Sequence, residues 1–161
     1  MPLFVLSPAS LAHSALFAGY YSYLTANVVS YRLKSGVMLG TGEAGSVRHP
    51  KHKASPKDAE NEEALQRAVR AHGNFTEGTP FAFFLIFLAE LNGAPTYLAH
   101  AAYTTLLVAR VAHAEIGIRA ADTLGVGRPV GTIATVAVAL GAGAYNLSLG
   151  WEPLKSFLGL K

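Results

Sequence analysis

Three polar side chains of different chemistry stand at helical spacing just before a strongly apolar segment. Arg70, Asn74 and Glu77 follow one another at i, i+4 and i+7, so on an α-helix they share one face. Arg67 extends this face by one turn, and the four side chains fall within an arc of roughly 80°. A cation, an amide and a carboxylate together can bind a small zwitterionic ligand with several carboxylates. For the two arginines alone, the alternative is that they reach toward anionic lipid headgroups.

A second polar stripe is predicted in the following helix. Arg110, His113 and Gly117 stand at i, i+3 and i+7, whereas Glu115 points to roughly the opposite side. Glu77 and Arg110 each lie well inside their helices, where a charge costs about 2.5–3.5 kcal/mol on insertion scales. Such charges usually face a partner or a cavity, so two interpretations stay open. The residues form a ligand site, or Glu77 and Arg110 form an interhelical pair that only orients the bundle.

The composition indicates an integral membrane protein that positions these stripes on long helices. Of 161 residues, 51% are hydrophobic and 14% are charged, against about 25% charged in soluble domains. The apolar segments predict four membrane helices, at about residues 7–34, 59–92, 96–121 and 129–151. We therefore expect one all-α domain over residues 1–161, a four-transmembrane-helix bundle with a polar loop between its first two helices.

The basic residues predict the orientation of this bundle. Most of the 13 Lys and Arg residues lie in the two connections on one side, whereas Lys155 and Lys161 lie on the other. The positive-inside rule then places both connections in the cytoplasm, both termini outside and the polar stripe near the cytoplasmic side. The net charge of +3 does not indicate nucleic acid, because the basic residues crowd the ends of apolar spans instead of forming one soluble face.

Several other kinds of site are not expected. The chain has no cysteine, which excludes thiolate nucleophiles, disulfides and cysteine metal sites. The histidines do not stand at metal-ligand spacing with carboxylates, so no metal is expected. The glycine-rich segment 36–45 does not match a dinucleotide-binding motif, since no strand precedes it. Glu90, next to the turn after the second helix, is expected at the membrane interface.

The stripe on the second helix also carries a family resemblance. Arg67-Ala-Val-Arg70-Ala-His72-Gly-Asn74-Phe-Thr-Glu77-Gly-Thr-Pro80 resembles the second-helix signature of the MAPEG family, the membrane-associated proteins of eicosanoid and glutathione metabolism. The small bacterial branch of the family shares the motif Arg-Ala-His-Gly-Asn-Phe, and Arg110-Val-Ala-His113 is similar to a segment of the prostaglandin synthase branch. The resemblance implies a homotrimer in the bacterial inner membrane. Glutathione would lie between neighbouring subunits, near the cytoplasmic side.

The resemblance further implies roles for single residues. Arg128, just before the fourth helix, would be the catalytic arginine that stabilises the glutathione thiolate, because a guanidinium beside a thiol lowers its pKa. The thiolate would attack a hydrophobic electrophile that arrives through the membrane lipid, as in a detoxifying transferase or peroxidase. The residues expected to bind glutathione are Arg32, Arg67, Arg70, His72, Asn74, Glu77, Arg110 and His113.

Three positions depart from the family pattern. Gly78 and Gly117 stand where the family often has tyrosine, and Pro129 stands where the prostaglandin branch has serine. These changes remove aromatic walls and a hydroxyl, so prostaglandin or leukotriene synthesis is not expected. The alternative function is a non-catalytic trimeric membrane protein that binds lipid or another anionic ligand in the same cleft. A small multidrug-type transporter would place a carboxylate inside the first helix, which has none.

Overall fold

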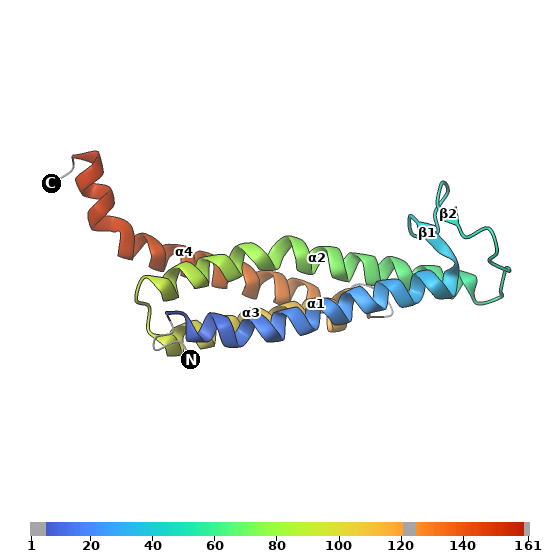
Figure 1. Ribbon diagram of the computed structural model, residues 1–161, viewed down its shortest axis with the longest axis horizontal. Helices are drawn as coiled ribbons and strands as arrows, with labels where there is room; N and C mark the ends of the chain where they lie inside the picture. The colour runs from blue at the N-terminus through green and yellow to red at the C-terminus, as the bar shows by residue number, and fades with distance from the viewer. Residues whose placement is uncertain (1–5, 121–124, 160–161) are drawn as a thin grey trace.

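Long helices form almost the whole of the protein, as the computed structural model shows over residues 6–120 and 125–159 (Figure 1). The elements are α1 (Pro8–Ser35), β1 (Val37–Leu39), β2 (Val47–Arg48), α2 (Asp58–Leu91), α3 (Thr96–Val111), the π-helix η1 (Ala112–Ile118) and α4 (Gly127–Leu158). α1 and α2 lie side by side along an elongated rod, and α4 packs against α2, α3 and η1. The last turns of α4 leave the bundle and point away from it (Figure 1).

The third helix differs from the sequence prediction of one α-helix ending near residue 121. Its regular α-turns end at Val111, and it continues as the π-helix η1 to Ile118. A π-helix has wider turns than an α-helix, and such turns are common at functional sites. The start of α4 packs closely on these turns. A Cβ atom on Gly127 would lie 2.2 Å from the carbonyl oxygen of Ala112, so this packing requires glycine.

The fourth helix is longer than the segment 129–151 that the sequence predicts. It begins at Gly127 and continues to Leu158. Glu152 and Lys155 form an i,i+3 ion pair at 2.9 Å in the additional turns, which favours their helical conformation. Gly159, with a φ of 67°, then ends the helix in the left-handed conformation that glycine adopts without steric cost.

Aromatic rings and small side chains fill the core between the helices. The rings of Phe83 and Tyr103 lie 4.5 Å apart between their centroids, and Phe17 meets Phe83 edge-on at 5.1 Å. Buried alanines such as Ala71 and Ala99 allow the helices to approach closely. The aromatic side chains thus join α1, α2 and α3 over the half of the rod that carries few charges.

α4 is the one helix in the described part of the chain whose length and hydropathy suit a membrane crossing. Most of its apolar side chains are exposed, because only Gly127, Gly131 and Thr135 are buried. α1 carries no acidic residue but is rich in Ser, Thr and Tyr, and α2 carries most of its charged residues in its first half. Both features lower the mean hydropathy of those two helices.

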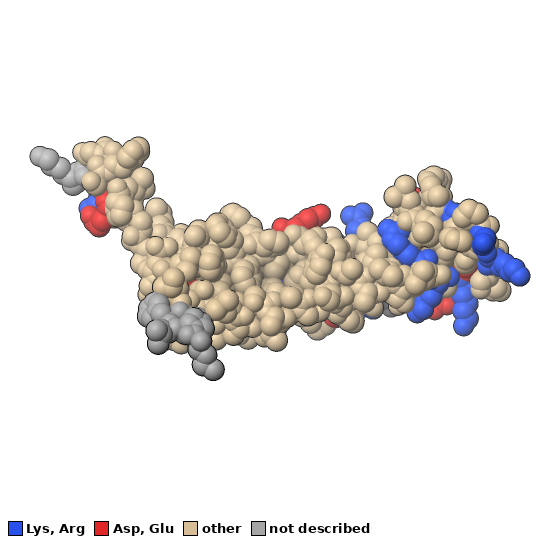
Figure 2. Space-filling view, viewed as in Figure 1, with Lys and Arg blue, Asp and Glu red and all other residues tan. Residues whose placement is uncertain are grey.

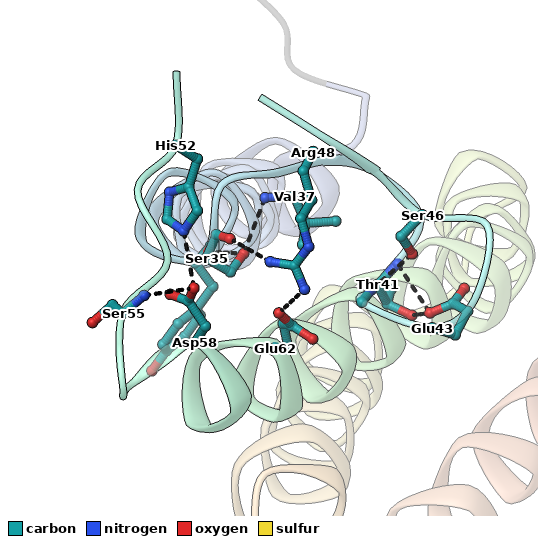
Figure 3. A network of polar contacts seen from close by, with 12 residues as sticks. Ser35, Val37, Thr41, Glu43, Ser46, Arg48, His52, Ser55, Asp58 and Glu62 are labelled. Carbon is teal, nitrogen blue, oxygen red and sulfur yellow. Dashed lines mark hydrogen bonds and ion pairs between the residues drawn. The ribbon is translucent and has the colours of Figure 1, made fainter. Parts of the chain in front are cut away.

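The segment between α1 and α2, predicted as a polar loop, folds into a compact cap over residues 36–57 (Figure 3). Its two strands pair antiparallel. Arg48 donates to the Ser35 carbonyl at 3.3 Å and forms an ion pair with Glu62 of α2. Asp58, the first residue of α2, accepts from the Ser55 N–H at 3.0 Å, and this bond is the main reason that its pKa lies below the usual range. The cap is therefore attached to both helices.

Charge is distributed unevenly over the surface of the rod. Figure 2 shows Lys and Arg gathered at the end that carries the cap, while the long middle of the same face is nearly free of them. The cap itself contributes Arg48, Lys51, Lys53 and Lys57, with Glu43 as its single acidic residue. This pattern separates a basic end from an apolar body.

Candidate functional site

The predicted stripe on α2 lies on the outside of the single protomer. Arg70 and Glu77 are exposed, and Asn74 is half-buried. Neither Arg70 nor Glu77 has a hydrogen-bond or ion-pair partner among the described residues. After Glu77 the helix carries no further charge until Glu90, so this carboxylate stands on a surface that is expensive for a charge in a membrane.

Arg110 reaches from α3 to this stripe. Its side chain is buried, with 5% of the residue exposed, and one guanidinium nitrogen donates to the Asn74 carbonyl at 2.7 Å and to the Asn74 side-chain oxygen. The guanidinium lies against Gly78, where a Cβ atom would come within 3.4 Å of it. Arg110 thus occupies the space beside Gly78.

This geometry corrects the idea of an interhelical Glu77–Arg110 pair. Arg110 bonds to Asn74, and Glu77 takes no part in an ion pair within the described residues. The reason is helical phase, because Asn74 and Gly78 face α3 while Glu77 lies roughly 60–100° further round α2. The carboxylate therefore stays available for another partner.

His113 and Arg128 meet where η1 packs on the start of α4. The imidazole Nδ1 lies 2.9 Å from the Arg128 carbonyl oxygen. Because a carbonyl only accepts, Nδ1 must carry the proton. His113 is buried, whereas the side chain of Arg128 is exposed. A cation in the first turn of a helix is unfavourable to the helix dipole.

The remaining predicted site residues of α2 lie against neighbouring side chains. His72 faces α1, with Nε2 at 3.2 Å from the Thr25 hydroxyl and its ring 5.2 Å from that of Tyr21. Arg67 forms an i,i+4 ion pair with Glu63, one turn nearer the cap. Of the stripe, the structure thus joins Asn74 to Arg110 directly and leaves Arg70 and Glu77 on the open face.

Arg32 lies apart from the stripe and binds the cap. Its guanidinium donates to the carbonyl oxygens of Val37, Met38 and Gly40, at 3.4, 3.2 and 3.0 Å. All three bonds come from one nitrogen of the guanidinium, Nη1. In the single protomer Arg32 therefore orders the strand β1 that follows α1.

Glu90 is buried, not interfacial as the sequence suggests. Its carboxylate accepts from the backbone N–H groups of Ala9 at 2.8 Å and Ser10 at 2.9 Å, and from the Ser10 hydroxyl at 2.5 Å. The Ser10 hydroxyl also lies 2.8 Å from the Tyr103 hydroxyl. The first N–H groups of a helix lack partners within it, and α1 has no side-chain cap of its own. The sequence itself does not indicate this contact, because Ser7 followed by Pro8 is an ordinary helix start.

An apolar groove runs between α1 and α2 beside the stripe. Its volume is about 660 Å³, and its walls include Phe17, Phe75, Phe83 and Phe84. Thr76, the residue before Glu77, also lines it. The groove can accept an apolar molecule from the side of the bundle, next to the charged face of α2.

The fold and the site define a membrane helical bundle with one polar face in an apolar surface. The MAPEG family matches residues 10–148, which include nearly all of α1, the whole of α2 and α3, and most of α4, and the chain belongs to this family. The resemblance drawn from the second-helix signature is thereby confirmed. MAPEG proteins share an all-helical membrane fold.

Two curated bacterial proteins are similar to part of the chain. The inner membrane protein YecN of Escherichia coli strain K12 is 43% identical over 49 residues, which make up 30% of this chain and 37% of YecN. The YecN protein of Escherichia coli O6:H1 strain CFT073 matches with the same identity and coverage. The aligned segment thus spans little more than a third of the length of these relatives.

Proposed function

We propose that this protein is a bacterial inner-membrane transferase or peroxidase that uses glutathione against hydrophobic electrophiles. The observation that carries the proposal is the contact between Arg110 and Asn74, beside the open face with Arg70 and Glu77. It joins two cations, an amide and a carboxylate from two helices in a chain that belongs to the MAPEG family.

These groups match the chemistry of glutathione, which carries two carboxylates, an ammonium and a thiol. A guanidinium binds a carboxylate through two parallel hydrogen bonds, as Arg70 can do from the open face. Glu77 can accept hydrogen bonds from the ammonium, and Asn74 stays oriented by Arg110. Arg70 and Glu77 then each gain a partner that the described residues of the single protomer do not supply.

The exposure of this face supports a homotrimer with four membrane spans in each subunit. A carboxylate that faces lipid is costly, and a neighbouring subunit with glutathione between the two would remove Glu77 from lipid. In this arrangement Arg128 reaches the ligand from α4, near the cytoplasmic side. Its guanidinium and the N-terminus of α4 both favour an anion, so both stabilise a thiolate over a thiol.

In conjugation, the thiol proton leaves to water as Arg128 stabilises the thiolate. The sulfur then forms a bond with the electrophilic carbon of the substrate, and the electron pair of the bond that breaks leaves with a departing anion or, in addition to a double bond, goes to the neighbouring atom, which takes a proton from water. A hydrophobic substrate enters from the bilayer through the groove between α1 and α2, whose aromatic walls lie next to Thr76. The charged stripe and the apolar groove thus hold the two reactants side by side, which lowers the entropic cost of their reaction.

Thermal melting of the purified protein with and without glutathione tests the proposal. Glutathione at a hundred times its Kd should stabilise the protein by about 2.7 kcal/mol. Arg128→Leu should keep trimer assembly and lose most conjugation, whereas Lys53→Leu, which removes an exposed cation of the cap, should change neither.

Two results would contradict the proposal at different points. Unchanged turnover in Arg128→Leu would remove that arginine from the mechanism. If saturating glutathione leaves melting unmoved and no thiolate absorbance appears, the enzyme proposal is wrong. The same face would then serve a non-catalytic trimer that binds lipid or another anionic ligand.

A further inference from the structure

We propose that Gly117 and His113 are positioning residues that fix Arg128 relative to the stripe on α2. In this arrangement η1 holds the backbone of the first turn of α4, and the backbone holds the guanidinium. The inference rests on the proposed function, because it gives His113 a role through Arg128 in place of direct contact with glutathione. It also explains why this chain has glycine at position 117.

The first observation is the close approach of the two backbones. A Cβ atom on Gly117 would lie 2.7 Å from the Arg128 nitrogen and 3.1 Å from its Cα. The next turn of α4 lies as close to α3, since a Cβ atom on Gly131 would lie 2.4 Å from the Ala109 carbonyl oxygen. These atoms belong to backbones, so no side-chain rotation could relieve the overlap. Any larger residue at 117 must push the first turn of α4 away.

The second observation is the hydrogen bond of His113 to the same turn. Nδ1 donates to the Arg128 carbonyl at 2.9 Å, and the Thr132 hydroxyl lies 3.3 Å from the same nitrogen. With 5% of the residue exposed, the imidazole is held among protein groups. Its ordered donor sets both the distance and the rotation of the turn that carries Arg128.

The third observation is a continuous set of contacts from α4 to α2. Arg110 lies one turn before His113, and Arg110 bonds to Asn74. A shift of Arg128 relative to η1 is therefore also a shift relative to the stripe that would hold the ligand. The π-helical turns begin at Ala112, between these two side chains, and bring His113 and Gly117 to the same surface of α4.

The test compares Gly117→Ala, His113→Leu and His113→Asn with Gly143→Ala, a control whose added Cβ would have nothing within 4 Å. Gly117→Ala and His113→Leu should lower kcat ten- to a hundredfold, as expected for a displacement of about 1 Å, with KM changed less than threefold. The pH midpoint of thiolate absorbance should rise in both. His113→Asn, which keeps a donor, should recover most of kcat, and a merely structural histidine would not show this recovery.

A readout that needs no ligand accompanies the kinetics. The NMR spectrum of protein with ¹⁵N-labelled histidine reports the Nδ1–H signal of His113, which is assigned by its loss in His113→Asn. This signal should change its chemical shift in Gly117→Ala and keep it in Gly143→Ala. The inference is overturned if this signal is unchanged in Gly117→Ala. The inference is also overturned if Gly117→Ala and His113→Leu keep the wild-type kcat while Arg128→Leu loses its activity. If the wild-type protein neither binds nor converts glutathione, the proposed function is wrong. The contact of His113 and Gly117 with the turn of Arg128 then has no catalytic role.

Discussion

Replacing Glu90 with alanine should detach the start of α1 from the end of α2. The buried carboxylate is the acceptor for two backbone N–H groups, those of Ala9 and Ser10, and for the Ser10 hydroxyl. Both residues are buried, so water cannot replace the carboxylate without opening the structure. Three donors would lose this acceptor in a single substitution, and of these the Ser10 hydroxyl keeps the Tyr103 hydroxyl as a partner.

The expected loss follows from these contacts. A buried donor left without a partner costs about 1–3 kcal/mol, and a lost helix cap costs about 0.5–2 kcal/mol. We therefore expect Glu90→Ala to lower the free energy of unfolding by about 3 kcal/mol. Glu90→Gln keeps one oxygen acceptor and should cost about 1 kcal/mol. Glu152→Ala is the matched control, because that carboxylate is 78% exposed and its surface ion pair contributes little.

Unfolding in mixed micelles of a mild detergent and dodecyl sulfate, followed by far-UV circular dichroism, measures these differences. Protein concentration must be equal in all samples, because assembly contributes to the stability of an oligomer. Glu90→Ala should unfold at a clearly lower fraction of dodecyl sulfate, with Glu90→Gln between it and wild type. If Glu90→Ala shifts the midpoint no more than Glu152→Ala does, the cap on α1 does not stabilise the fold and the reasoning is wrong.

Three further predictions concern the cap and the packing of α4. Hydrogen bonds hold the pKa of Asp58 low, so their stabilisation is present above the unfolded pKa of about 4 and is lost as pH falls through the folded value. Below that pH, hydrogen exchange over residues 36–57 should accelerate. The acceleration should be smaller in Asp58→Asn, which already lacks the charge. Gly131→Ala should destabilise by about 1–3 kcal/mol through overpacking, whereas Gly141→Ala, with open space around it, should be nearly neutral in the same unfolding assay. Arg32→Gln should speed exchange in β1 without changing glutathione affinity, and a loss of affinity would place Arg32 in the ligand site.

Part of the site could be read from residue spacing alone. Arg70, Asn74 and Glu77 share one side of α2 because helical periodicity depends only on the local backbone. The MAPEG resemblance rests on the same short segment, and the family match over residues 10–148 confirms it. The assignment of Arg128 and of the glutathione ligands stays a prediction.

Other parts of the site depend on contacts between distant residues. Arg110 bonds to Asn74 and not to Glu77, because the relative rotation of α2 and α3 decides which side chain it meets. Glu90 caps a helix that begins some 80 residues earlier in the chain, and no local pattern near Glu90 indicates this. Arg32 turns to the carbonyl groups of the cap, which the sequence predicted only as a loop.

The helical membrane class and the polar face of α2 follow from composition and from periodicity along one helix, and the family follows from the second-helix signature. Only the tertiary structure decided what each polar group meets. The π-helical turns of η1 and the glycines at 117, 127 and 131 allow α4 to approach so closely that His113 bonds to the backbone of Arg128. Such an approach depends on the summed packing of helices far apart in the chain, so its physical cause lies outside any single segment.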